Sequence, residues 1–520
     1  MSSLPQTIRH TVQLCGDKTA TRFGDRSQSW REFQDRIARL ATGLHGLGVE
    51  DGDRVAVLAL NSDRYYEFYF GVSWAGAVFV PVNTRLAPAE FVHWLNDSGS
   101  RVVFVDDSFL PAIAEIRDQL ETVQHFVYMG DHLLPDGFLA FEDLISNNAP
   151  ASPTDRGGDD MAGLFYTGGT TGKSKGVMLS HRNLTHNVLQ SLPYFNVSDD
   201  DIFLHAAPMF HIADGFFCMI GATLGCTNVI VPAFEPTLVL KTLQDEKIST
   251  ALLVPTMINM VVNFPELPSY DLSHMRNMLY GASPMPEAVI TKAMEVIPHV
   301  DFFQAYGQTE ASPVVTIMGP EYHTNSGPNA GKINGAGRAI AGVDLAVFDE
   351  DGAMLPPGEV GEVCIRGENV MLGYWNLPEI TAEALRNGWL HTGDSGRLDE
   401  DGMLFIVDRV KDMIVSGGEN VYSAETEQAV YQHPAVAECA VIGIPDESWG
   451  EQVHAIVVLK AGESVTGQQL IDHCKTLIAG FKCPKSVSFR EEPLPLSGAG
   501  KILKKDLRAP FWKGRGRNVS

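Results

Sequence analysis

The chain has 520 residues, of which 44% are hydrophobic and 20% are charged, so it is long enough for two or three globular domains. Its formal net charge of −25 repels a phosphate backbone and argues against nucleic acid as a major partner. The seven cysteines are odd in number and form no C-x-x-C pair, which argues against a disulfide framework and a zinc ribbon.

The N-terminus lacks the apolar core of a signal peptide. The most apolar stretch, 215–231, is interrupted by threonines and an asparagine and is interpreted as a buried segment. We therefore expect no transmembrane segment and a cytoplasmic location. Whether the chain forms a homodimer is left open.

Short apolar runs alternate with helical patterns through the first two thirds of the chain. Helices are predicted at 65–78 and 89–99. Continuous apolar strands separated by helices are typical of largely parallel sheets that are covered on both faces. The runs that predict strands are 54–60, 101–107, 228–232, 250–256 and 277–283.

The pattern changes after about residue 330, where glycine and proline become dense and short strands alternate. This predicts a small β-rich subdomain at roughly 331–408. A final α+β unit follows Ser423, with a helix near 467–478. The expected fold class is α/β, with a large N-terminal domain of mostly parallel sheets covered by helices and a small α+β domain at the C-terminus.

A loop rich in small and hydroxyl residues, LFYTGGTTGKSKGVMLSH, lies at 164–181 and is predicted to lead from an apolar run into a helix. Glycines let backbone N–H groups approach phosphate oxygens, while threonine hydroxyls and lysine add donors and positive charge. The loop is not a P-loop, because that motif requires glycine at position 167, where Thr167 stands. Taken alone, a solvated turn explains such a loop about as well.

Four further motifs accompany this loop: YGQTE at 306–310, GWLHTGD at 388–394, DRVKDMIVSGGENVYSAE at 408–425 and PLPLSGAGK at 493–501. With them, nearly the whole chain resembles the adenylate-forming superfamily of acyl-CoA synthetases, aryl-CoA ligases, luciferases and peptide-synthetase adenylation domains. It is most similar to stand-alone fatty-acid or aryl carboxylate CoA ligases. The resemblance implies an AMP-forming acid–thiol ligase that uses ATP, Mg²⁺ and coenzyme A and passes through an acyl-adenylate.

Two residues of the phosphate loop depart from the superfamily pattern. Gly168 replaces a serine, which removes one side-chain donor, and Ser174 replaces a proline, which makes the loop less rigid before Lys175. Neither change removes the threonines or the lysine charge. We expect the loop to work, with an altered affinity for ATP.

The resemblance implies a phosphate-binding loop, an adenine-binding wall of small residues with one aromatic ring, and a ribose-binding pair made of a carboxylate and a guanidinium. The implied cofactor-binding residues are Thr167, Gly168, Gly169, Thr170, Thr171 and Lys175 in the loop, Gly281, Ala282, Ser283, Tyr306, Gly307 and Thr309 around adenine, and Asp394 and Arg409 at the ribose.

The resemblance also implies catalytic roles for Lys501, His211, Glu310 and Thr170. Glu310 would hold Mg²⁺, because a carboxylate beside a triphosphate is costly unless a cation lies between them. Lys501, on a glycine-rich tip, would bridge the attacking carboxylate and the α-phosphate.

A further implication is that the C-terminal domain, 409–520, rotates against the N-terminal domain, 1–408, between the two half-reactions. Lys411 would be the hinge. Gly417 and Gly418 would line the pantetheine channel, where a β-carbon would narrow the passage.

The acyl pocket implied by the resemblance is roomy, because two of its positions are small. Its residues would be His211, Ala213, Gly215, Phe217, Tyr280, Gly281 and Ala305. A medium- or long-chain fatty acid and an arylpropenoate both fit this description. Asp214, between two of these positions, is interpreted as a structural hydrogen-bonding residue.

Three functional classes stay open: a stand-alone CoA ligase, an adenylating enzyme that loads a carrier protein in trans, and a luciferase-like oxygenase or non-catalytic acyl-binding relative. The presence of Lys501, Glu310 and Asp394 argues against the inactive version. The first class is the leading hypothesis.

Overall fold

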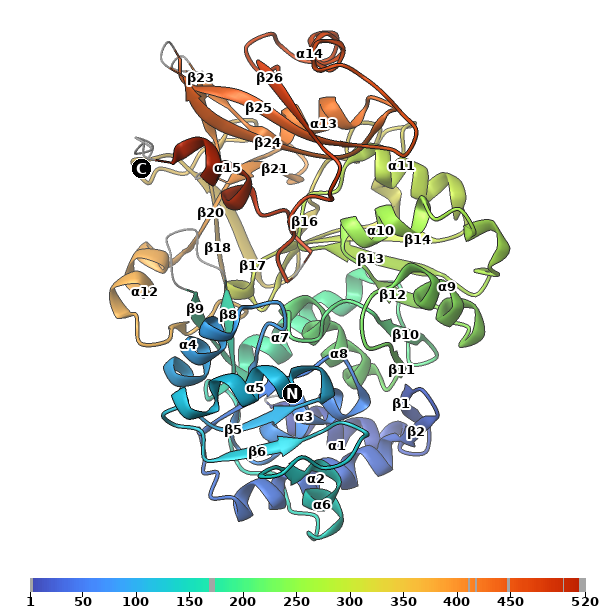
Figure 1. The fold of residues 1–520 in the computed structure, drawn as a ribbon, viewed down its shortest axis with the longest axis vertical. Helices are drawn as coiled ribbons and strands as arrows, with labels where there is room; N and C mark the ends of the chain where they lie inside the picture. The colour runs from blue at the N-terminus through green and yellow to red at the C-terminus, as the bar shows by residue number, and fades with distance from the viewer. Residues whose placement is uncertain are drawn as a thin grey trace.

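The computed structural model describes residues 3–167, 174–409, 412–416, 419–446, 449–498 and 500–513. Figure 1 shows a large lower part built from two sheets and their helices, with a smaller part, coloured orange to red, above it. The two large sheets are mostly parallel and covered by helices, which confirms the predicted α/β fold class.

Sheet A has nine strands, which are largely parallel in the middle and antiparallel at both edges. In spatial order they are β16 (Arg338–Ala339), β15 (Val314–Met318), β14 (Asp301–Gly307), β13 (Asn277–Gly281), β12 (Thr250–Leu252), β10 (Ile202–His205), β11 (Thr227–Ile230), β1 (Thr19–Phe23) and β2 (Arg26–Ser29).

Sheet B has eight strands and is parallel except at one edge. In spatial order they are β19 (Gly373–Tyr374), β9 (Lys175–Ser180), β8 (Met161–Thr167), β4 (Val78–Pro81), β3 (Arg54–Leu58), β5 (Ser100–Val105), β6 (His125–Tyr128) and β7 (Leu139–Ala140).

Helices fill the space between the two large sheets and cover their outer faces. The core between the sheets receives side chains from α1 (Leu4–Cys15), α2 (Trp30–Gly46), α3 (Asp63–Trp74), α6 (Phe141–Ser146), α7 (His181–Ser191) and α8 (Ile212–Leu224). The outer face of sheet A packs on α9 (Pro236–Asp245), α10 (Pro255–Val262) and α11 (Glu287–Val296), and that of sheet B on α4 (Pro88–Ser98) and α5 (Leu110–Ile116). Every residue of α3 is buried, because this helix lies within the central layer.

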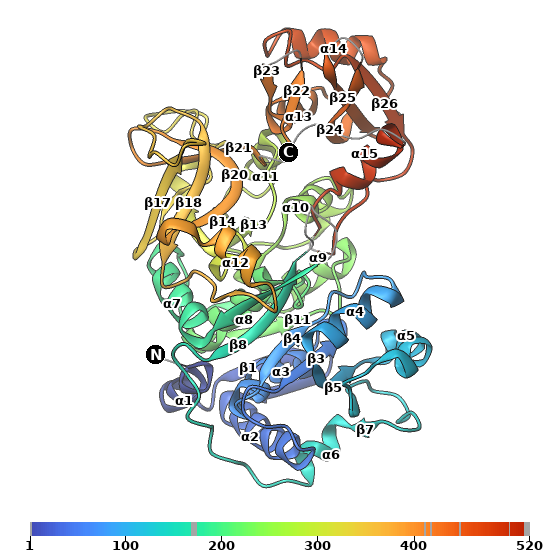
Figure 2. The same ribbon diagram turned by 90° about the vertical axis from the view of Figure 1, so that its left-hand side faces the viewer.

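The last third of the chain forms two smaller sheets, which are coloured yellow to red in the upper half of Figure 2. Sheet C is antiparallel and contains β17 (Val343–Phe348), β18 (Gly361–Gly367), β20 (Leu390–Leu398) and β21 (Leu404–Arg409). Sheet D contains β23 (Glu419–Val421), β22 (Ile414–Ser416), β25 (Gly450–Leu459), β24 (Val436–Asp446) and β26 (Ser486–Arg490). The helices of this part are α12 (Pro378–Ala384), α13 (Ser423–Tyr431), α14 (Gly467–Lys475) and α15 (Lys504–Trp512).

The predicted elements are present, with shifts of a few residues at their ends. Each of the five predicted apolar runs contains a strand, and α3, α4 and α14 correspond to the three predicted helices. The stretch 215–231 forms most of α8 and β11 and is largely buried, as interpreted. The boundaries of the proposed domains stay a prediction.

The prediction that the phosphate loop leads directly into a helix is wrong. Lys175 begins strand β9, which pairs antiparallel with β8, and helix α7 begins only at His181. The segment KGVMLS can form this strand because it packs Val177 and Leu179 into the central core. Its backbone also pairs with the backbone N–H and C=O groups of β8. Strands β8 and β9 therefore pair on either side of the loop, and α7 begins only after β9.

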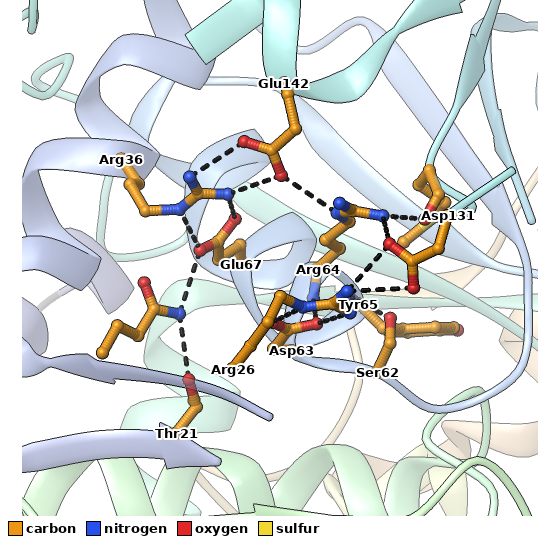
Figure 3. Close-up of polar contacts among 12 residues, drawn as sticks. Thr21, Arg26, Arg36, Ser62, Asp63, Arg64, Tyr65, Glu67, Asp131 and Glu142 are labelled. Carbon is orange, nitrogen blue, oxygen red and sulfur yellow. Dashed lines mark hydrogen bonds and ion pairs between the residues drawn. The ribbon is translucent and has the colours of Figure 1, made fainter. Parts of the chain in front are cut away.

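A network of ion pairs, drawn in Figure 3, ties α3 to α2, to α6 and to the turn after β6. Arg36 contacts the buried Glu67 at 2.6 Å and also Glu142, at 3.0 Å. Arg64 contacts Glu142 at 3.0 Å and Asp131 at 2.8 Å. Burial raises the pKa of Glu67 and Arg36 opposes that shift, so the arginine keeps this buried carboxylate compatible with the core.

No helix in the described ranges is long and apolar enough to cross a membrane. All seven cysteines are free thiols, in agreement with the expectation of no disulfide framework.

The buried His323 is expected to make folding stability fall as the pH is lowered. Its Nδ1 lies 2.9 Å from the carbonyl oxygen of Gly319 and its Nε2 lies 2.8 Å from the hydroxyl of Tyr280, an arrangement that a neutral imidazole satisfies. Burial lowers the pKa of His323 from 6.5 to about 4. The unfolded chain therefore takes up a proton below about pH 6.5 that the native protein refuses, which costs about 2 kcal/mol by pH 5.

The measurement is the free energy of unfolding at pH 7 and pH 5 for the wild type and for His323→Gln, whose amide can donate to Gly319 and accept from Tyr280. The variant should lose less stability between the two pH values. The exposed His10→Gln is the matched control. Equal losses in His323→Gln and the wild type would contradict the assignment.

Candidate active site

The predicted site residues lie where strands of both large sheets end. Thr167 ends β8, Gly281 ends β13 and Gly307 ends β14, while His211 follows β10. These strands belong to the parallel parts of sheets A and B, so within each sheet their carboxyl ends lie at the same edge. In open α/β sheets this edge is the usual place for a ligand, because loops there are free to vary while the strands hold them.

On the phosphate side, the structure describes the two ends of the loop. Thr167 and Lys175 are cross-strand partners on β8 and β9. The predicted residues Gly168, Gly169, Thr170 and Thr171 lie outside the described residues, which resume at 174.

Tyr374 connects Lys175 with Glu310. The Lys175 ammonium lies 4.7 Å from the centre of the Tyr374 ring, and the Tyr374 hydroxyl donates a 2.9 Å hydrogen bond to Glu310 Oε1. Burial, and then the neighbouring Glu310, raise the pKa of Tyr374, so this hydroxyl keeps its proton and acts as the donor. Glu310 sits on a short 3-10 turn, Thr309–Ala311, directly after β14, with Thr309 buried beneath it.

The small residues predicted around adenine are required by close backbone approach. A Cβ on Gly307 would lie 1.8 Å from the carbonyl oxygen of Pro313, and a Cβ on Gly281 would lie 2.2 Å from that of Ala305. Ala282 has a φ of 67°, in the left-handed region, so the chain turns sharply there before Ser283. Only small residues allow β13 and β14 to end side by side in this way.

The ribose side joins sheets A and C. The Tyr306 hydroxyl donates a 2.8 Å hydrogen bond to Asp394 Oδ2, and the Asp394 side chain is buried. Asp394 and Arg409 are cross-strand partners on β20 and β21. The structure thus brings Tyr306, Asp394 and the backbone of Arg409 together.

A loop from the C-terminal end of the chain lies on this region. The backbone N–H of Lys501 donates to Ser497 Oγ, which closes a tight turn at 497–501. Arg85, after β4, donates to the Ser497 carbonyl at 3.0 Å, and Thr256, after β12, donates to the Gly500 carbonyl at 3.4 Å. The loop therefore rests on the ends of strands from both large sheets, and Figure 2 shows the red segment before α15 descending toward them.

His211 lies near Lys501 at the N-cap of α8. Its Nδ1 accepts a 3.3 Å hydrogen bond from the backbone N–H of Ala213, so in the neutral ring the proton is on Nε2. Burial, and then the nearby Lys501 ammonium, lower the pKa of His211 to about 3. The ring is consequently uncharged near neutral pH and can donate one hydrogen bond from Nε2.

The predicted acyl-pocket residues do not all gather in one layer. Phe217 stacks on Phe203 with ring centres 4.3 Å apart in the core between the sheets, and Ala305 packs against the same core. Tyr280 instead belongs to the core on the outer face of sheet A, with α10 and α11, and its hydroxyl contacts His323. Adjacent residues of a strand point to opposite faces, which separates Tyr280 from Gly281 in this way.

Gly215 lies close to a tyrosine of α3. A Cβ at Gly215 would approach the Tyr69 hydroxyl to 3.1 Å, so the position is small because α3 packs against α8 there. Asp214 contacts His205 Nδ1 at 3.1 Å in the same core. This agrees with the interpretation of Asp214 as a structural hydrogen-bonding residue.

Lys411, Gly417 and Gly418 lie outside the described residues, so their predicted roles in the hinge and the pantetheine channel stay predictions.

Sequence reasoning missed three residues that the structure places at the site: Tyr374, Arg85 and Asn83. A Cβ on Gly498 would lie 2.2 Å from Asn83 Oδ1, so the loop at 497–501 and the segment after β4 are in close contact. No spacing rule links positions so far apart in the chain. The only signal was that Asn83 and Arg85 follow an apolar strand, where site residues of α/β proteins collect.

Comparison with known protein families decides the assignment. The model of the AMP-binding enzyme family matches residues 8–375, and that of the AMP-binding enzyme C-terminal domain matches residues 425–501. The chain belongs to the AMP-binding enzyme family. The predicted membership of the adenylate-forming superfamily is therefore confirmed.

Three similar proteins place this AMP-binding enzyme among its relatives. It is 40% identical to a feruloyl-CoA synthase of Amycolatopsis sp., over 95% of this chain and 96% of that protein. It is 37% identical to the fatty acid–[acyl-carrier-protein] ligase ScoC of Streptomyces coeruleorubidus, over 100% of this chain and 98% of the relative. The crystal structure of the anthranilate CoA ligase AuaEII in complex with anthranoyl-AMP matches with a TM-score of 0.90 at 28% identity, over 98% of this chain and 97% of the other.

Proposed function

We propose that this AMP-binding enzyme, a carboxylate–CoA ligase, converts an acid, ATP and coenzyme A into acyl-CoA, AMP and pyrophosphate by way of an acyl-adenylate. The observation that carries the proposal is the loop at 497–501, which rests on segments that follow strands of both large sheets and brings the Lys501 charge near His211, whose pKa is lowered by burial and then by that charge. A cation delivered there can neutralise two anions that must approach each other, the carboxylate and the α-phosphate.

The phosphate end of ATP is proposed to bind between the β8–β9 hairpin and Glu310. Lys175 supplies positive charge and Thr167 a hydroxyl, with Gly168, Gly169, Thr170 and Thr171 between them. Glu310 fits Mg²⁺, because it offers a carboxylate whose orientation is fixed by Tyr374, and Mg²⁺ is usually held by one or two carboxylates together with substrate phosphates. When bound, Mg²⁺ would offset the charge of the triphosphate.

The adenosine end is proposed to lie between the ends of β13 and β14 and sheet C. Gly281, Ala282, Ser283 and Gly307 are small residues beside which a flat base can lie, and the Tyr306 ring can stack on it. Asp394 can accept hydrogen bonds from the ribose hydroxyls and Arg409 can donate to them. The bond from Tyr306 to Asp394 supports this arrangement, because it orients the carboxylate before the nucleotide arrives.

His211 is proposed to position the acid. A neutral imidazole with its proton on Nε2 donates to a carboxylate oxygen without forming an ion pair that would lower the nucleophilicity of the acid. Lys501 then provides the charge. His211 thus orients the acid, and Lys501 neutralises the charge of the carboxylate and the α-phosphate.

For the second half-reaction we propose that the C-terminal domain, 409–520, turns about Lys411 and brings Gly417 and Gly418 toward the thiol of coenzyme A. The hydrogen bonds from Arg85 and Thr256 to the loop at 497–501 end on backbone carbonyl oxygens, to which water can donate in their place, and this supports a reversible docking.

The acid is proposed to be a medium- or long-chain fatty acid or an arylpropenoate. Ala213 and Gly215 are small, and the relatives named for feruloyl and fatty-acid chemistry support both classes. ScoC also supports a second candidate function, transfer of the acyl group to a carrier protein in trans.

The test is a panel of acids assayed with ATP and Mg²⁺, with either coenzyme A or a phosphopantetheinylated carrier protein as acceptor. We expect AMP and pyrophosphate as products, turnover with coenzyme A, and loss of turnover with EDTA. ADP as the stoichiometric product would overturn the proposal. Turnover with the carrier alone would replace the ligase by the second candidate.

Tyr374→Phe is expected to raise the Mg²⁺ concentration needed for half-maximal activity about tenfold. The substitution keeps the ring under Lys175 but removes the hydroxyl that orients Glu310. Activity as a function of Mg²⁺ at saturating ATP measures the effect, with the surface variant Tyr194→Phe as control. An unchanged Mg²⁺ requirement would mean that Tyr374 does not act through Glu310.

A further inference from the structure

Strands β18 and β20 bring a carboxylate, a thiol and an imidazole together on one face of sheet C. Glu362 and Cys364 are two residues apart on β18, so their side chains share a face, and His391 is the cross-strand partner of Cys364. His391 Nδ1 lies 2.7 Å from Glu362 Oε2 and 3.3 Å from Cys364 Sγ. Three ligand types that suit a thiophilic metal thus meet at one point.

Within the part of the chain that the structure describes, one other group has three such ligand atoms within 4.8 Å of one another: His205, Asp214 and Cys218. That group is fully buried in the central core, and both ring nitrogens of His205 are already engaged, by Asp214 and by Asn228. A cation could reach it only by opening the core. The group on sheet C is closer to solvent, since the side chains of His391 and Glu362 are 9% and 24% exposed.

We propose that Glu362, Cys364 and His391 form a binding site for a thiophilic divalent cation of the Zn²⁺ class. Thiolate, imidazole and carboxylate are the ligands of such ions, and ligand atoms around a tetrahedral zinc lie about 3.3–3.7 Å apart. The Sγ–Nδ1 distance of 3.3 Å already matches that spacing. The carboxylate has only to withdraw slightly from the ring, and water completes the coordination.

Two features of the site oppose the cation and set its affinity. Burial, and then Glu362, raise the pKa of Cys364 to about 12, so binding must release the thiol proton to the buffer. The Arg386 guanidinium lies 3.1 Å from Glu362 Oε2 and competes for the same carboxylate. Arg386 is half-exposed and can move into solvent when a cation arrives.

The site is coupled to the strand that carries the ribose carboxylate. The pairing of β18 with β20 shifts in register between Glu362, which pairs with Ser395, and Cys364, which pairs with His391. Asp394 lies in the irregular segment of β20 between these two partners. Glu362 Oε1 accepts a 3.1 Å hydrogen bond from the backbone N–H of Gly393. A cation held by both strands would clamp this irregular segment of β20.

The experiment is a titration of the full, nucleotide-free chain with Co²⁺, followed by the near-ultraviolet charge-transfer absorption that arises only when a thiolate binds the metal. The wild type should show a saturable band. Cys364→Ser should abolish it, and Glu362→Gln, which keeps an acceptor for Gly393, should weaken binding at least about tenfold. Arg386→Gln should strengthen metal binding severalfold, because the variant lacks the guanidinium that competes with the metal for Glu362.

Cys218→Ser is the matched control for the buried group and should leave the band unchanged. Thermal unfolding without metal shows whether each variant is folded. If Cys364→Ser does not fold, Glu362→Gln and Arg386→Gln still test the proposal. A wild type with no charge-transfer band would overturn the proposal. So would a band that persists in Cys364→Ser or disappears in Cys218→Ser.

Discussion

Lys501→Ala is expected to slow acyl-adenylate formation about 100- to 1,000-fold, the scale for removing one well-placed electrostatic donor from a transition state. The loop at 497–501 rests on Arg85 and Thr256 through backbone carbonyl groups, so the alanine variant should keep the loop in place and lose only the charge. Release of pyrophosphate, measured with acid and ATP but without coenzyme A, reports this step alone.

The same variant should still make acyl-CoA when it is given synthetic acyl-AMP, because Lys501 is proposed to act only before the adenylate exists. Lys505→Ala, which removes a neighbouring exposed lysine, is the matched control and should leave both half-reactions intact. If Lys501→Ala damages the two half-reactions equally, the division of labour between two arrangements of the C-terminal domain does not hold.

Asp394→Ala should weaken the use of ATP about ten- to a hundredfold, because a hydrogen bond to a charged group is worth roughly 1.5–3 kcal/mol. The carboxylate is buried and receives the Tyr306 hydroxyl, so its removal also leaves that donor without this acceptor. The effect should appear in kcat/KM for ATP, with a smaller change for the acid.

Asp344→Ala is the control, since it removes an exposed carboxylate from the same sheet, paired there with Arg366. It should change kcat/KM for ATP little. An Asp394→Ala variant within twofold of the wild type would show that the ribose binds elsewhere.

The outcome at the phosphate loop shows how local signals fail. The spacing of glycines and threonines marked the loop. The prediction of a helix directly after it was wrong, because pairing with β8 makes the segment at 175–180 a strand, β9. A short run such as KGVMLS fits several backbone conformations, and pairing with a distant neighbour selects one.

Tyr280 and Tyr374 show the same limit for side chains. Tyr280 directly precedes Gly281, Ala282 and Ser283 in sequence, yet the alternation of its strand turns it to the outer face of sheet A, toward His323. Tyr374 has no motif that marks it, yet the pairing of β19 with β9 sets it between Lys175 and Glu310. The role of Tyr280 in the acyl pocket stays a prediction, and no spacing in the sequence could predict the contacts of Tyr374.

The sequence by itself determined the fold class, the existence of most strands and helices, and the motifs that identify the chemistry. These depend on hydrophobic periodicity and on residue types within short windows, which need no knowledge of distant contacts. Only the tertiary structure decided that the loop at 497–501 rests on segments that follow strands of both large sheets, and that burial and then Lys501 lower the pKa of His211. Those contacts join residues hundreds of positions apart, and Coulomb and hydrogen-bond energies depend on distance in space rather than on distance along the chain.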